Sequence, residues 1–101
     1  MLKLKDNEDK LKRVSRMMKV LSNPGRLLVV DLLLNSSGLS VGEIAEATNL
    51  SQSNASQHLK SLEYAGVLHS ERQGKTIRYS IGHRGIAKLM SCIDDCVECE
   101  T

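Results

Sequence analysis

The sequence predicts a small, mainly α-helical domain with one β-hairpin, in the order α-α-α-α-β-β-α. Apolar residues recur at helical spacing over most of the 101 residues. They switch to strand-like alternation only within residues 67–81, where Gly74 can supply a turn between two strands. This length suits one domain, so we treat residues 1–101 as a single unit.

The first two helices are predicted on either side of a short polar break. Residues 8–21 carry apolar side chains at every third or fourth position, which indicates an amphipathic helix. Ser22 or Asn23 can cap a second helix, and Pro24 suits the first helical position, where a missing N–H costs nothing. Residues 27–34 are apolar on most faces, which predicts that this second helix forms the buried centre of the fold.

The next two helices are predicted to be joined by a tight turn. Ser40 and Glu43 have the spacing of a capping box at the start of a short helix. Residues 49–51 form the turn, and Ser51 caps a following helix over about 51–65. The hairpin over about 67–81 comes next, and a last helix covers about 84–98. A helix-turn-helix followed by a hairpin is the pattern of a winged helix-turn-helix domain.

The second helix of such a pair enters the major groove of DNA, and the helix over 51–65 has the side chains for it. It has no acidic residue from 51 to 62, so nothing there repels phosphate. Its polar side chains can both donate and accept hydrogen bonds, as base edges require. The candidate DNA-binding residues on this helix are Ser51, Gln52, Ser53, Asn54, Ser56, Gln57, His58 and Lys60, with packing between helices as the alternative for His58. Those around the hairpin tip, for backbone phosphates or the minor groove, are Arg72, Lys75 and Arg78.

The net charge of +2 conceals an uneven distribution along the chain. Residues 94–101 hold four of the 12 acidic side chains and none of the 14 basic ones. Residues 1–93 therefore carry 14 basic and eight acidic side chains, a net charge of +6. A basic body suits an anionic partner such as double-stranded DNA.

All three cysteines lie in the last ten residues, at Cys92, Cys96 and Cys99, on one stripe of the last predicted helix. Thiolates bind soft ions, so Zn(II), Cd(II), Pb(II) or As(III) are candidate ligands. Cys92 and Cys99 are about 10 Å apart along a straight helix, so Cys96 and Cys99 are the better pair for one ion. A complete tetrahedral site needs further groups, which a second subunit could supply.

Two other interpretations of the thiols remain open. Cys96 and Cys99 have Cα atoms about 5 Å apart on a helix, which allows a disulfide or polysulfide bridge formed by oxidants or reactive sulfur. The cysteines could instead pack as small apolar residues in an interface. A third possibility, from another functional class, is a small metal-buffering protein, which would not explain the polar, acid-free stretch over 51–62.

Five segments of the chain resemble the ArsR/SmtB family of metal- and stress-responsive bacterial repressors. The most specific is the stretch LSQSNASQHLK, which is similar to the recognition helix of that family. The matching segments are residues 21–27, 39–45, 50–60, 63–68 and 74–81. The resemblance implies a homodimeric repressor on a near-palindromic operator, with the first and last helices forming the dimer interface.

The same resemblance bears on sensing. Many members of the family bind metal through ligands at both ends of the last helix, paired across the dimer. The corresponding positions here are His83 and Gly85 at the first end and Cys96 and Cys99 at the other. Gly85 has no side chain to bind metal, so the resemblance implies a candidate site made of His83, Cys96 and Cys99, with Cys92 one turn behind. The family's alternative thiol site is absent, because Ser40 and Gly42 occupy its two cysteine positions.

Other classes are disfavoured by what the sequence lacks. No apolar stretch approaches the roughly 20 residues of a membrane span, and no apolar signal segment opens the chain, so we expect a cytoplasmic protein. No nucleophile–base pair or glycine-rich phosphate loop occurs, so we do not expect an enzyme or a permanent cofactor.

Overall fold

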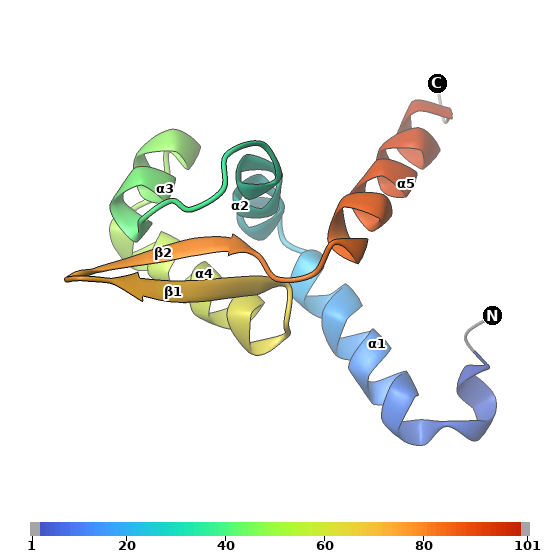
Figure 1. Cartoon of the computed structure of the whole chain (residues 1–101). Helices are drawn as coiled ribbons and strands as arrows, with labels where there is room; N and C mark the ends of the chain where they lie inside the picture. The colour runs from blue at the N-terminus through green and yellow to red at the C-terminus, as the bar shows by residue number, and fades with distance from the viewer. Residues whose placement is uncertain (1–2, 100–101) are drawn as a thin grey trace.

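The computed structural model describes residues 3–99, and its elements follow the predicted order (Figure 1). A 3₁₀ turn at Leu4–Asp6 precedes four helices, a two-stranded sheet and a last helix. Their bounds are α1 Glu8–Leu21, α2 Pro24–Asn35, α3 Val41–Thr48, α4 Gln52–Tyr64, β1 Leu68–Gln73, β2 Thr76–Ile81 and α5 Gly85–Cys99. No helix in this range has the length and hydropathy needed to cross a bilayer.

The helices begin at the capping residues that the sequence predicts. The side chain of Asn23 accepts a hydrogen bond from the backbone N–H of Arg26 at 3.1 Å, which settles the choice between Ser22 and Asn23. The capping box of α3 is complete, because Ser40 N donates to Glu43 Oε1 at 2.9 Å and Glu43 N donates to Ser40 Oγ at 3.2 Å. These local bonds fix where α2 and α3 start.

The core lies between α2, α3 and α4, with the first residues of the hairpin closing one end. Val29, Val30 and Leu33 of α2 are at most 2% exposed, which confirms that this helix is the centre of the fold. One side of α2 is open nonetheless, since Leu28 is 51% exposed. The buried apolar residues that pack together are Val20, Leu21, Val29, Val30, Leu33, Ile44, Leu59, Leu62, Val67, Leu68 and Ile86.

The hairpin is antiparallel and is held to the helical body at its base. Its pairing runs from Leu68 opposite Ile81 to Gln73 opposite Thr76, and Gly74 turns the chain with a φ of 64°. Tyr79 N donates to Leu39 O at 2.8 Å, and Leu39 N donates back to Tyr79 O at 3.2 Å. The segment before α3 thus extends the sheet by one bridge. This bridge places the β1–β2 hairpin, the wing of the domain, beside α3 and α4.

Helices α1 and α5 extend away from this core on the same side of the molecule (Figure 1). Within residues 3–99, Ile86 is the one buried residue of α5. Large apolar side chains are exposed on both helices: Leu11 and Met18 on α1, and Ile93 and Val97 on α5. Burying such side chains is favourable by roughly 25 cal/mol for each Å² removed from water, so these two helices present an apolar surface suited to association.

Candidate nucleic-acid interface

Helix α4 has one buried side and one open polar side. Ala55, Leu59 and Leu62 are fully buried against the core. Ser53, Gln57 and Lys60 are exposed, and at 100° per residue they project from the opposite side of the helix. Gln52 and Asn54 are also exposed, whereas Ser56 is partly buried. The helix therefore offers solvent a row of hydrogen-bonding groups without a carboxylate until its last turn.

The turn before α4 fixes the direction of this row. Asn49 adopts a left-handed backbone conformation, with φ 59°, which asparagine tolerates better than most residues. Leu50 N donates to Ala45 O at 3.1 Å, so the chain reverses directly after α3. Ser51 then caps α4 by accepting from Asn54 N at 3.0 Å. Ser51 is thus exposed near the helix start, but its hydroxyl is already used in the cap.

A surface groove separates α4 from the wing. Lys60 of α4 and Lys75 at the hairpin turn line it from opposite sides, so two ammonium groups flank the same space. Four hydroxyl-bearing side chains share the lining, and the full set is Ser40, Val41, Gly42, Ser56, Lys60, Lys75, Thr76, Ile77 and Tyr79. Ammonium and hydroxyl groups are the usual donors to the phosphates of DNA. Arg72 remains exposed near the turn, where its Nε donates to Gly74 O at 3.2 Å.

Arg78 does not have the position predicted for it among the cations of the wing tip. Its Nη1 donates to Gly38 O at 3.0 Å and to Glu43 Oε1 at 3.3 Å. The pKa of Glu43 is lowered chiefly by the hydrogen bond from the Ser40 backbone, with Arg78 contributing less. Arg78 thus fastens β2 to the start of α3, and this contact turns its guanidinium toward the body of the protein.

His58 also has a position that differs from an open base-reading residue. It is partly buried against the start of α2, where a Cβ added at Gly25 would lie 2.7 Å from His58 Nε2. Burial lowers the pKa of His58, and the nearby charge of Arg26 lowers it further. We therefore assign His58 to the packing of α4 on α2 and leave it out of the proposed base-reading set.

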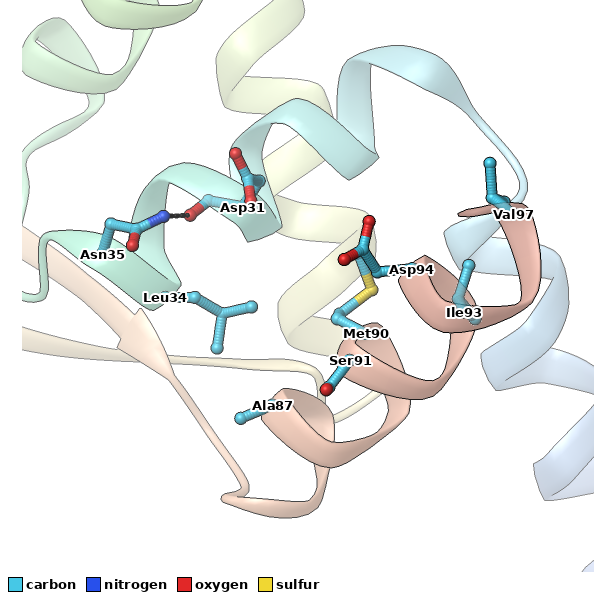
Figure 2. Close-up of a pocket in the computed structure, with 9 residues that line it drawn as sticks. All are labelled: Asp31, Leu34, Asn35, Ala87, Met90, Ser91, Ile93, Asp94 and Val97. Carbon is cyan, nitrogen blue, oxygen red and sulfur yellow. Dashed lines mark hydrogen bonds between the residues drawn. The ribbon is translucent and has the colours of Figure 1, made fainter. Parts of the chain in front are cut away.

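The three cysteines are exposed on α5. Figure 2 shows the groove between α2 and α5, and no cysteine lines it. Asp94 does line this groove, together with Asp31 and Asn35 of α2. The carboxylate of Asp94 is therefore separated from the thiols, although the two are neighbours in sequence.

His83 lies at the other end of α5 from Cys96 and Cys99. Its Nδ1 accepts a hydrogen bond from Gly85 N at 2.9 Å, which ties the imidazole to the first turn of the helix. Cys96 follows 13 residues later, about 20 Å along the helix axis at 1.5 Å per residue. Within residues 3–99 of one chain, no group of three or more His, Cys, Asp or Glu side chains is placed to hold a metal ion. A complete site would therefore need a second subunit.

The open polar helix, the tight turn before it and the basic wing define the class of the protein, a winged helix-turn-helix domain of the kind that binds DNA. Residues 23–70 match the sequence model of the family described as "Bacterial regulatory protein, arsR family". The regulator YgaV of Escherichia coli is 33% identical over 81 residues, which cover 80% of this chain and 82% of YgaV. The cadmium resistance transcriptional regulatory protein CadC of Lactococcus lactis is 38% identical over 77 residues, or 76% of this chain and 65% of CadC.

A solved structure from Mycobacterium bovis aligns with this chain with a TM-score of 0.84 at 29% identity. It is the homodimeric winged helix-turn-helix DNA-binding domain of a possible ArsR-family regulator. The alignment covers 93% of this chain and 86% of that one. The chain belongs to the ArsR family of bacterial transcriptional regulators, which confirms the resemblance seen in the sequence. Members of this family are DNA-binding regulators and not enzymes. The family membership therefore favours a transcriptional regulator over a metal-buffering protein.

Three hydroxyl-bearing members of the α4–wing groove, Ser40, Thr76 and Tyr79, were not among the predicted DNA-binding residues. They reach the groove because the bridge between Leu39 and Tyr79 brings the start of α3 beside β2. A pairing over such a sequence separation leaves no local pattern that a single sequence would show. The signal that points to Ser40 is its capping role, which indicates the start of α3 but not the neighbouring strand.

Proposed function

We propose that this regulator represses transcription by binding a near-palindromic operator in double-stranded DNA as a homodimer. The observation that carries the proposal is the exposed, acid-free row of polar side chains on α4 beside the groove with Lys60 and Lys75. Gln52, Asn54 and Gln57 have the amide groups that pair with adenine edges, and Ser53 can serve several bases. Arg72 and Lys75 contact the phosphate backbone of the DNA, and these contacts set the position of α4 in the major groove.

The dimer in this proposal forms through α1 and α5. Support comes from the exposed Leu11, Met18, Ile93 and Val97 on these helices, and from the homodimeric state of the similar Mycobacterium bovis domain. A two-fold dimer places its two recognition helices about one DNA turn apart, roughly 34 Å, which is why the operator should be nearly palindromic.

Replacing Gln57 with alanine should weaken operator binding by about 1–3 kcal/mol and relax the base preference at one position of each half-site. Gln57 lies at the middle of the exposed side of α4, so the substitution removes a base contact without touching the core. The measurement is selection of DNA from a random library by each variant, followed by fluorescence anisotropy on the selected sites. Gln73→Ala, at the end of β1, is the control, because a wing residue should leave the base preference intact. An unchanged preference in Gln57→Ala would remove the assignment.

The inducer in our proposal is a soft metal or metalloid ion bound at Cys96 and Cys99, with Cys92 one turn behind. Zn(II), Cd(II), Pb(II) and As(III) have the required affinity for thiolates. Two features support this: the thiols are exposed on α5, and a relative, CadC, is named for cadmium resistance. Because His83 is distant from the thiols of its own chain, the site we propose uses His83 of the partner subunit.

Binding of the ion across the two α5 helices would change how the subunits are placed relative to each other. The separation of the two α4 helices then no longer matches one DNA turn, and operator affinity falls. The second candidate uses the same scaffold and the same thiols, with oxidants or reactive sulfur bridging Cys96 and Cys99. Both thiols are exposed, and their Cα atoms are about 5 Å apart by helix geometry, which favours keeping this candidate.

A further inference from the structure

A second cationic groove lies between α1 and the end of α4, away from the wing. Three basic side chains line it, two from α1 and one from the first turn of α2. The lining residues are Arg16, Lys19, Val20, Arg26, Ser61, Tyr64 and Ala65. None of the three basic residues belongs to the helix-turn-helix pair or the wing, so the usual motif does not account for them.

The charges in this groove have no carboxylate partner within residues 3–99, at salt-bridge distance. Two neighbouring cations of α1 do have one, since Lys12 pairs with Glu8 at 3.7 Å and Arg13 with Asp9 at 3.3 Å. Lys12 and Arg13 near the middle of α1 are therefore paired, whereas Arg16 and Lys19 nearer its end are not. Unpaired cations gathered around one groove create a positive potential that favours an anion.

Two of the three charges are also held in place. The guanidinium of Arg16 lies over the ring of Tyr64, 5.7 Å from its centre. Arg26 donates from Nη1 to Val20 O at 3.3 Å, and its buried Nε has no acceptor within the described part of the chain. Arg26 thus contributes a fixed charge at the back of the groove, whereas Arg16 and Lys19 are exposed and accessible to a ligand.

The groove is continuous with the side of α4 that we propose reads bases. Ser53, Gln57 and Tyr64 project from the same side of the helix, and Tyr64 lies about 10 Å beyond Gln57 along the axis. The major groove is about 12 Å wide, so a helix that reads bases with its first half has its second half beside a phosphate strand. The end of α4 and the groove next to it are therefore where a backbone should pass.

The groove stays open when α1 takes part in the proposed dimer. At 100° per residue, Lys19 projects about a quarter of a turn and Arg16 about two fifths of a turn away from the exposed apolar residues Leu11 and Met18 of α1. A partner that covers the apolar side would leave these two cations facing solvent.

We propose that this groove binds the phosphate backbone of the DNA duplex that α4 reads, with Arg16 and Lys19 in contact and Arg26 behind them. The inference rests on the proposed operator binding and extends its footprint from the wing side of α4 to the α1 side. These contacts are independent of sequence, so they add affinity and set position without adding base preference.

The test measures operator affinity by fluorescence anisotropy over a series of salt concentrations, for the wild type, Arg16→Gln, Lys19→Gln and the double variant. Each lost phosphate contact should reduce the slope of log K against log salt by about 0.9 and weaken binding about tenfold or less near 0.1 M salt. Lys88→Gln is the matched control, because it removes the same charge from an exposed site of α5 outside the groove. Circular dichroism of each variant checks that the fold is retained.

Because the proposed homodimer carries each substitution twice, we expect a slope reduced by about two in each single variant and by nearly four in the double variant, with base preference unchanged. Slopes and affinities equal to those of Lys88→Gln would overturn the inference, while the wild type would still bind its operator specifically. Failure of the wild type to prefer any sequence would instead overturn the proposed function. A third outcome is that inorganic phosphate binds the wild type but not the double variant, while the salt slopes of DNA binding stay unchanged. The groove would then bind a small anion, and the inference would also be overturned.

Discussion

Replacing both Cys96 and Cys99 with serine is expected to abolish the release of operator DNA by the inducer, while affinity without inducer stays at the wild-type value. Serine hydroxyls are poor ligands for soft ions and cannot form sulfur bridges. Both thiols are exposed on α5, so their loss should not disturb the core or α4. Since allosteric coupling is typically 1–3 kcal/mol, the wild type should lose about 5–150-fold in operator affinity when Cd(II) or As(III) is added.

Mass spectrometry of protein purified without oxygen identifies the chemistry behind this response. Separate exposure to Zn(II), Cd(II), Pb(II), As(III) and polysulfide gives mass increments that distinguish a bound ion, a disulfide and a sulfur bridge. Cys92→Ser serves as the control, because Cys92 is one turn behind the proposed pair and should retain most of the response. If the inducer released the Cys96→Ser, Cys99→Ser double variant from operator DNA at the same concentration as the wild type, these thiols would be excluded as the sensing site.

Replacing Leu59 with alanine should lower the free energy of unfolding by about 2–5 kcal/mol, the usual range for a leucine removed from a packed core. Leu59 is 0% exposed and lies on the buried side of α4, where it helps to hold the recognition helix against α2 and α3. Urea unfolding at one fixed protein concentration measures the change, because the stability of a dimer depends on concentration. Ile77→Ala is the control, since Ile77 is 42% exposed on the wing and should cost much less. Equal losses in the two variants would contradict this placement of the core.

The fold was largely predictable because its boundaries are encoded by local chemistry. Ser40 and Glu43 have the spacing of a capping box, and both of its hydrogen bonds form. Gly74 lies between two alternating segments, and it turns the hairpin with positive φ. Such signals involve residues that are near one another in sequence, so one sequence is enough to interpret them.

Positions that depend on contacts between distant segments were harder to predict from the sequence. Arg78 looks like a wing-tip cation in sequence, but the hairpin brings it to Gly38 and Glu43, 40 and 35 residues away. His58 looks like part of the polar row on α4, but it lies against Gly25 at the start of α2. Asp94 is beside the thiols in sequence, but it lies on the side of α5 that faces α2 (Figure 2).

The arrangement of α1 and α5 explains why the sensing site stays a proposal while the DNA-reading helix is well defined in one chain. The side chains that orient α4 come from the same subunit, in the core formed with α2 and α3. The residues of the proposed thiol site instead lie on α5 or just before it, and this helix extends from the core with Ile93 and Val97 exposed. In our proposal a second subunit supplies the remaining ligands, and no pattern within one chain specifies how two α5 helices would meet.

The most direct test of this account is the specificity of DNA binding by the wild-type protein. DNA selected from a random library, and a duplex of the same composition with its base order permuted, are titrated by anisotropy at physiological salt. The account predicts a nearly palindromic selected site, with half-sites about one turn apart, bound at least about 10³-fold more tightly than the permuted duplex. Equal affinity for the two duplexes would contradict the claim that α4 reads an operator.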